Sequence, residues 1–176
     1  KRTEFASSVV LKYSKLTPAE LWKTFFSDAE FNALTFLDWC SDRSGEEESG
    51  FVNTFQRDTY YYSQVIDISS IEVPIPATIS AVDSGPKNSN TTNSTAEFRI
   101  YRNGGFDSWR TSITANYVDG SGGLRPGDKI QLRVKTANWY TTATTVTFTV
   151  SDETWGTNLG LSAASFSRTW SITTRK

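Results

Sequence analysis

Histidine and cysteine, two residues widely used for acid–base and nucleophilic chemistry, are scarce in this 176-residue chain, which contains no histidine and one cysteine, Cys40. Without histidine, a His-based catalytic triad and a histidine metal site are excluded, and a lone cysteine can form neither a Cys–His pair nor a thiolate zinc site. Two carboxylates would still suffice to hydrolyse a glycosidic bond. The acidic candidates are Asp107, Asp119, Asp128, Asp152 and Glu153. All of them fall in expected turns, where acids are usually solvated or hydrogen-bonded to nearby backbone, so we expect no catalytic residue and no enzyme.

The sequence also lacks the patterns of a metal or cofactor site. A surface Ca²⁺ site needs clustered oxygen ligands, and Asp119, Asp128 and Asp152 show no Asp-x-Asp spacing. The glycine-rich stretch from Gly120 to Gly123 lies between expected strands and lacks the Lys-Ser/Thr ending of a phosphate-binding loop. We therefore expect no metal and no cofactor.

Aromatic side chains, which make up 14% of the chain, are the best candidates for binding. Trp139, Tyr140 and Trp155 fall in expected loops or at strand ends, where rings can stack on sugars or anchor a protein partner. Such rings more often close the open ends of a β-domain, and both roles are kept for these three. Trp109 and Trp170 lie inside expected strands, so we expect both in the core.

Charge and hydropathy narrow the range of partners. The net charge is −1, so no excess of positive charge points to nucleic acid or to an anionic membrane. No stretch approaches the roughly 20 apolar residues that a membrane-spanning helix needs, and no signal peptide is recognisable. The chain contains no methionine, which indicates that Lys1 is not a translation start. We expect neither nucleic-acid binding nor membrane insertion.

Two helix-start signals stand close together near the beginning of the chain. The run Thr17-Pro18-Ala19-Glu20 combines a capping hydroxyl, a first-turn proline and a capping-box acid, and Ser27-Asp28-Ala29-Glu30 repeats the pattern. These signals predict two short helices, the second running from Asp28 to about Cys40. Their apolar surface must be covered either by the sandwich or by a neighbouring chain, and the hypothesis carried forward is that it docks a partner. The predicted partner-docking residues are Leu21, Trp22, Phe25, Phe26 and Phe31.

Strand patterns flank these helices and dominate the second half of the chain. Residues 5–13 and 51–68 are expected to be extended, and short strands separated by turn signals follow from residue 71 onward. Inward faces are predicted by strict alternation in two strands: Ile130, Leu132 and Val134 in one, and Val146, Phe148 and Val150 in the other. The predicted fold class is an α+β segment over residues 1–69, with two short helices and flanking strands, followed by an all-β sandwich domain over residues 70–176.

The C-terminal part resembles an immunoglobulin-like module of bacterial and phage proteins. The likeness rests on the run Gly127 to Val134, the Thr-rich run from Thr141 to Phe148, and the closing strand from Phe166 to Thr174. Upstream, Ala96 to Ile100 with the turn Asn103-Gly104-Gly105 fits the same module. The sequence departs from it by a long insertion over residues 154–164. The resemblance covers roughly residues 70–174 and implies a spacer or ligand-facing domain without a catalytic site.

A second, shorter resemblance concerns the helical segment. The runs Leu16 to Glu20 and Phe26 to Glu30 resemble short helices encoded near the tail genes of tailed phages. Together the two resemblances imply a structural virion protein, in the tail or decorating the capsid, that associates with other virion proteins as a homo-oligomer or in many copies. Its immunoglobulin-like domain would face outward, either for assembly or for contact with the host surface, where a glycan is the candidate ligand. The alternative is a carbohydrate-binding or adhesive module on a bacterial cell surface.

Overall fold

The computed structural model describes residues 27–41, 50–68, 74–84, 90–116, 120–151 and 165–176, and these residues form antiparallel sheets. In the described part, one sheet has seven strands: β2 (Phe51–Val52), β1 (Trp39–Cys40), β3 (Tyr60–Ser63), β11 (Lys129–Lys135), β6 (Thr95–Arg102) and β7 (Gly105–Phe106) in spatial order, with β4 (Ile66–Asp67) also pairing with β11. A second sheet, of four described strands, orders β13 (Ser165–Thr173), β12 (Ala143–Ser151), β5 (Ala77–Asp83) and β8 (Ser112–Ile113). Two short strands, β9 (Ala115–Asn116) and β10 (Ser121–Gly122), pair separately.

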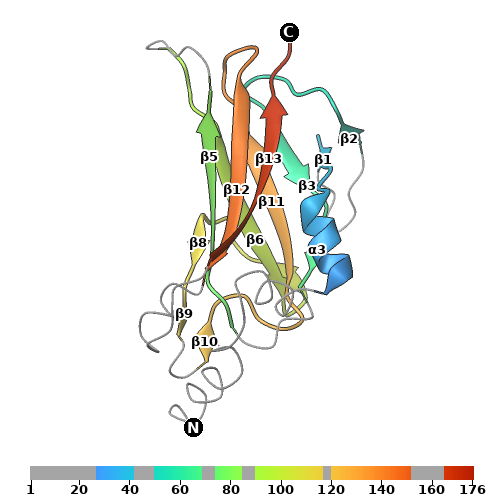
Figure 1. Cartoon of the computed structure of the whole chain (residues 1–176), viewed down its shortest axis with the longest axis vertical. Coiled ribbons are helices and arrows are strands. Elements are labelled where there is room, and N and C mark those ends of the chain that lie inside the picture. The colour runs from blue at the N-terminus through green and yellow to red at the C-terminus, as the bar shows by residue number, and fades with distance from the viewer. Residues whose placement is uncertain (1–26, 42–49, 69–73, 85–89, 117–119, 152–164) are drawn as a thin grey trace.

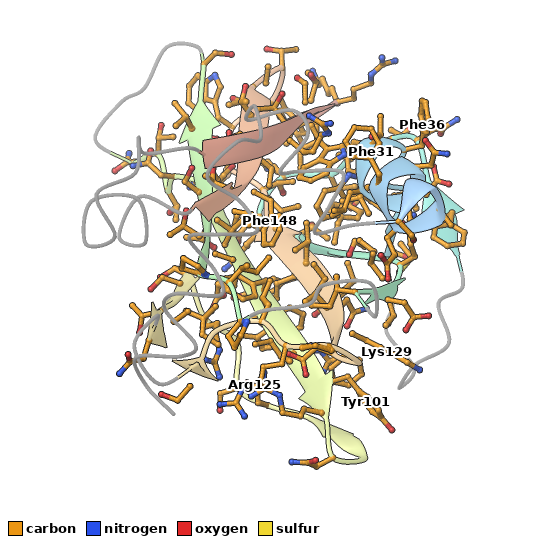
Figure 2. The ribbon with its side chains drawn as sticks, turned by 60° about the horizontal axis from the view of Figure 1, so that its bottom comes forward. Phe31, Phe36, Tyr101, Arg125, Lys129 and Phe148 are labelled. Carbon is orange, nitrogen blue, oxygen red and sulfur yellow. The ribbon has the colours of Figure 1, made fainter. Side chains whose placement is uncertain are left out.

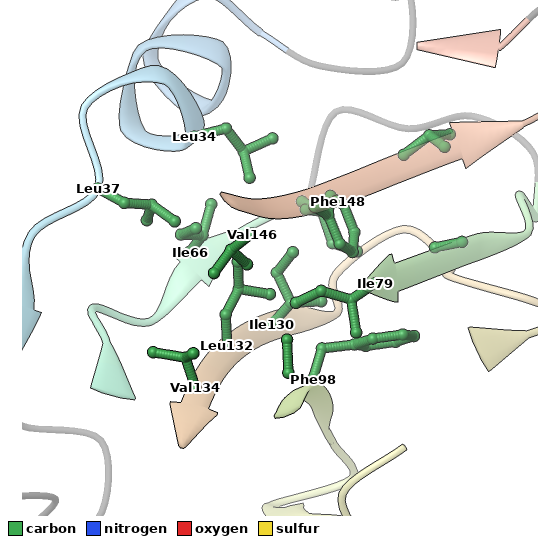
Figure 3. Packing of buried hydrophobic residues seen from close by; sticks show 14 of the residues in the cluster. Leu34, Leu37, Ile66, Ile79, Phe98, Ile130, Leu132, Val134, Val146 and Phe148 are labelled. Atoms are coloured by element: carbon green, nitrogen blue, oxygen red, sulfur yellow. The ribbon is translucent and has the colours of Figure 1, made fainter. Parts of the chain in front are cut away.

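The two large sheets pack face to face around one hydrophobic core, an arrangement compatible with a β-sandwich (Figure 1). The predicted inward faces are confirmed, because Ile130, Leu132 and Val134 of β11 are fully buried, as are Val146 and Phe148 of β12. Figure 3 shows these side chains meeting between the ribbons. The alternation of apolar and polar residues therefore sets which face of each strand enters the core.

The described helix, α3 (Asp28–Thr35), starts where the sequence predicts it. The Glu30 amide donates to Ser27 Oγ at 3.3 Å, and the Ser27 amide donates to Glu30 Oε2 at 2.8 Å, which completes the predicted capping box. Leu34 and Leu37 point from the helix and the turn after it into the shared core (Figure 3). The helix therefore closes one side of the sandwich (Figure 1).

The predicted α+β fold class is wrong. In the part of the chain that the structure describes, α3 is the single helix and it ends at Thr35, five residues before the predicted end. Trp39 and Cys40 are strand residues instead, because they pair with β3 (Trp39 with Ser63, Cys40 with Tyr62) and both side chains are buried there. This long-range pairing outweighs the local helical pattern. The first predicted helix and the expected strand at residues 5–13 lie outside the described residues.

Strands on both sides of the predicted domain boundary belong to the same sheet. β3 and β4 precede residue 69, and both pair with β11, which follows it. The register joins Tyr62 to Arg133 and Ile66 to Ile130. The chain before the boundary therefore extends the sheet that the later strands build.

Candidate binding surface

The outer face of the seven-stranded sheet, opposite the core, carries long cationic and aromatic side chains. On β11 the outward positions alternate with the buried ones and include Arg133 and Lys135. Cross-strand pairing sets Arg133 between Tyr62 of β3 and Glu97 of β6, and the next outward pair joins Gln131 to Arg99. Residues paired across antiparallel strands point to the same face, so the register gathers these groups in adjacent rows.

Three rings and two guanidinium groups alternate along this face, and we call them the outer-face stack. Arg99 Cζ lies 3.4 Å from the Phe106 ring centroid and 4.8 Å from that of Trp109. On the same tryptophan, Arg133 Cζ lies 4.4 Å from the ring centroid, and it lies 4.7 Å from the ring centroid of Tyr60. The order is therefore ring, cation, ring, cation, ring. Each contact is within the range at which a cation is attracted to the face of an aromatic ring.

Polar partners fix both guanidinium groups of the stack. Arg99 donates from Nε and Nη2 to Gln131 Oε1, at 3.0 and 2.7 Å, and Gln131 in turn donates to the Ser63 carbonyl at 3.0 Å. Arg133 donates from Nε and Nη2 to Glu97 Oε1, at 3.1 and 2.8 Å. Because Gln131 and Glu97 hold the two guanidinium groups in place, the Trp109 ring between them is ordered before any partner binds.

Trp109 reaches the outer face because its segment runs antiparallel alongside β6. Arg110 forms an isolated antiparallel bridge with Phe98, with backbone hydrogen bonds of 2.8 Å in both directions. Phe98 points into the core, and Trp109, one residue before Arg110, lies beside Arg99 on the opposite side of the sheet. The prediction that Trp109 belongs to the core is wrong. Trp170 packs against the core in a partly buried position.

Two tyrosines widen the aromatic part of this face. The Tyr62 ring centroid lies 6.1 Å from that of Trp109 and 6.4 Å from that of Tyr60, whose plane is inclined to it by 22°. Tyr60 is 36% exposed and Tyr62 is partly buried. The Arg99 side chain is buried, at 6% exposure, so the part of this face that is open to a partner is the ring surface of Tyr60 and Tyr62 with the partly buried Trp109 and Arg133.

The predicted ligand-stacking residues Trp139 and Tyr140 lie at another place, where β11 connects to β12. Trp139 is 36% exposed, and Arg57 Cζ lies 4.4 Å from the ring centroid of Tyr140. A hollow of about 410 Å³ opens beside them, which we call the end hollow. Its lining residues are Thr54, Gln56, Arg57, Tyr140, Arg175 and Lys176. Trp155, the third predicted residue, lies outside the described residues.

Of the predicted partner-docking residues, Phe31 is the one that the structure describes. Phe31, which projects from α3 (Figure 2), is partly buried against the protein's own core. The guanidinium carbon of Arg168 in β13 lies 4.2 Å from its ring centroid. Burial of the Arg168 guanidinium lowers its pKa, because desolvation disfavours the charged form. Leu21, Trp22, Phe25 and Phe26 lie outside the described residues. Two other phenylalanines in this part of the chain are exposed, Phe36 at 73% and Phe51 at 52%.

The acids in the described turns form structural contacts. Asp128 is buried and accepts from Arg102 at 2.8 and 2.6 Å and from the Arg125 amide at 2.8 Å, which fixes the turn before β11. Asp107 accepts from the Ile100 amide at 2.8 Å and pairs with Arg110. Within the described ranges, no group of three or more His, Cys, Asp or Glu side chains is placed to hold a metal ion.

Comparison with known proteins gives no relative for this chain: no family model, no curated protein and no solved structure matches it. No helix in the described part is both long enough and apolar enough to span a membrane. The chain is an antiparallel β-protein whose sheets are compatible with a sandwich. Its distinguishing features are the outer-face stack and the end hollow.

Proposed function

We propose that the chain is a non-enzymatic structural protein of a tailed-phage virion, in the tail or on the capsid, whose immunoglobulin-like sandwich contacts a partner through the outer-face stack. The observation that carries this proposal is the alternation of Phe106, Arg99, Trp109, Arg133 and Tyr60 on one sheet face. Tryptophan, tyrosine and arginine are the side chains that most often dominate the binding energy of protein interfaces.

The fixed geometry of the side chains in the stack favours a role in binding a partner. A side chain that is already immobilised loses little conformational entropy when a partner covers it, whereas ordering a mobile one costs about 0.5–1.5 kcal/mol. Arg133 is fixed by Glu97 and by two rings before contact. The surface is therefore suited to repeated contacts of one geometry, as a many-copy assembly requires.

The virion part of the proposal is supported by the sequence. The run Gly127 to Val134, which resembles the phage and bacterial module, forms a tight turn and then β11 at the middle of the sheet. Gly127 has a φ of +83° there, and Asp128 is buried by its bonds to the turn. The absence of histidine from the whole chain and its single cysteine support a role in assembly over one in catalysis.

Incorporation into particles tests this function. The full chain and its Trp109→Ala and Arg133→Ala variants are expressed in infected host cells, and the amount of each in purified particles is measured by immunoblotting. Thr145→Ala, an exposed position of β12 in the other sheet, is the control. The proposal expects normal amounts of the wild type and the control and reduced amounts of both stack variants. The proposal would be contradicted if the wild-type chain folded but were absent from the purified particles.

A second candidate function is a carbohydrate-binding or adhesive module of a bacterial cell-surface protein. The specific observation in its favour is the half-buried ring of Tyr140 beside the end hollow. The size of the particle with which the protein co-purifies separates the two functions, because a symmetric assembly of many copies fits the virion and not a cell-surface anchor.

A further inference from the structure

The end hollow gathers positive charge in a concave part of the surface. Three of its six lining residues, Arg57, Arg175 and Lys176, are cationic, and none of the six is acidic. Its volume of about 410 Å³ is within the range of small-molecule binding sites. Concave surfaces lined by one sign of charge concentrate the potential and attract ligands of the opposite sign.

An aromatic ring in the same hollow is held in place by one of these cations. The guanidinium of Arg57 lies 4.4 Å from the Tyr140 ring centroid, which fixes the two side chains relative to each other. Trp139, the preceding residue, is exposed beside it. A sugar ring can pack its apolar C–H face on such an aromatic ring while charged groups bind the sugar's substituents.

Backbone hydrogen bonds tie together the segments that form the walls of the hollow. The Arg175 amide donates to the Phe55 carbonyl at 2.9 Å, and the Thr141 amide donates to the Thr174 carbonyl at 2.8 Å. Thr174 Oγ1 also donates to the Trp139 carbonyl at 2.6 Å. The three wall segments, which are far apart in sequence, are therefore held in a fixed arrangement, and a fixed site binds with less loss of entropy.

We infer that the end hollow binds an anionic glycan, with the anionic substituent on Arg57 and Arg175 and a sugar face on Tyr140. Guanidinium groups bind carboxylate and sulfate oxygens through charge-assisted hydrogen bonds, which a neutral glycan cannot form. The inference rests on the second candidate function, the carbohydrate-binding module, and names the class of ligand for it. Carboxylated and sulfated sugars share this chemistry, and the experiment separates them.

Isothermal titration calorimetry of the full chain tests the inference with three probes: polygalacturonate oligosaccharides, dextran sulfate and neutral dextran. We expect binding to at least one charged probe, weakening as salt is raised, and none to neutral dextran. Arg57→Ala and Tyr140→Ala should each weaken binding about tenfold. Arg57 is exposed, so its variant tests the charge without disturbing the core. Affinity for one charged probe alone identifies the carboxylate or the sulfate as the preferred group.

Lys129→Ala is the matched control, because it removes one positive charge at the opposite end of β11, beside Tyr101 (Figure 2). It should leave the affinity unchanged. No binding to either charged probe, equal binding to neutral dextran, or equal losses in Arg57→Ala and Lys129→Ala would each overturn the inference, the last by showing non-specific attraction of polyanions. A chain that enters particles but binds no glycan would overturn this inference and leave the virion function standing.

Discussion

The guanidinium carbon of Arg133 lies 4.4 Å from the centroid of the Trp109 ring while the same group donates two hydrogen bonds to Glu97. Arg99 approaches the same tryptophan at 4.8 Å. Trp109 therefore joins two cations that belong to neighbouring strands, and it brings a segment from outside the main strands onto the sheet. Because this segment pairs antiparallel with β6 through Arg110, removing the ring should loosen both the stack and that pairing.

Trp109→Ala should lower the free energy of unfolding by about 2 kcal/mol, since two cation–ring contacts of about 0.5–1 kcal/mol each are lost together with buried ring area. Trp109→Phe keeps a ring and should lose about half as much. Urea denaturation followed by circular dichroism measures both. Trp139→Ala removes an exposed tryptophan elsewhere and should cost less than either. Equal losses for Trp109→Ala and Trp139→Ala would show that the stack contributes nothing.

Gly123 and Gly104 both have positive φ, at +66° and +81°, but only Gly123 is crowded. A Cβ at Gly123 would lie 2.7 Å from the Ile75 carbonyl oxygen and 2.8 Å from Ala115 Cβ, whereas nothing lies within 4 Å at Gly104. Gly104→Ala should therefore cost only the backbone strain of about 1 kcal/mol. Gly123→Ala should cost about 3 kcal/mol, because the clash is added to the strain. Thermal unfolding measures both variants. Equal melting temperatures for Gly123→Ala and Gly104→Ala would contradict the close packing around Gly123.

Phe148 lies at the centre of the core, fully buried on β12, with its ring centroid 5.7 Å from that of Phe98 in an edge-to-face arrangement. Phe148→Ala should lower the free energy of unfolding by about 3–5 kcal/mol, because a large cavity opens between the sheets. Thr145→Ala, at an exposed position of the same strand, should change it by less than about 0.5 kcal/mol. If Phe148→Ala cost as little as the surface variant, the two sheets would not share this core.

Arg102 and Asp128 form an ion pair whose nitrogen–oxygen distance is 2.6 Å, with side chains 33% and 3% exposed. A double-mutant cycle of Arg102→Ala and Asp128→Ala should give a coupling energy of about 1–3 kcal/mol. The hydrogen bond to Asp128 raises the pKa of Arg102. Burial lowers the same pKa, but by less than the hydrogen bond raises it. A pKa raised in the folded state adds stability that is present below the unfolded-state pKa and lost only above the folded-state value. The coupling energy should therefore be constant from pH 7 to pH 10, and a fall within that range would contradict this pairing.

Local patterns in the sequence were sufficient to predict several elements. Ser27 and Glu30 predicted the start of α3, because a capping box needs only neighbouring residues. The alternation of Ile130, Leu132 and Val134 with polar residues predicted the buried face of β11, because a strand with one face in the core requires it.

Features that depend on contacts between distant residues could not be predicted in this way. Trp39 ends the helical pattern because it pairs with Ser63, and no local signal marks that partner. Trp109 sits inside a pattern typical of a core strand, yet its position depends on how the following residue, Arg110, pairs with Phe98 of β6. One signal was available: Arg99 and Arg133 occupy outward positions of their strands, and Tyr60 and Tyr62 share a face of theirs. Together these indicate an outer face rich in cations and rings.

The most direct test of the central claim is quantitative mass spectrometry of virions purified from a host culture that expresses the full chain with a peptide tag. The account predicts many copies of the wild-type chain per particle, fewer copies of Trp109→Ala, and an unchanged number of Thr145→Ala. It would be contradicted if the folded wild-type chain were recovered from the medium or the cell surface and were absent from the purified particles.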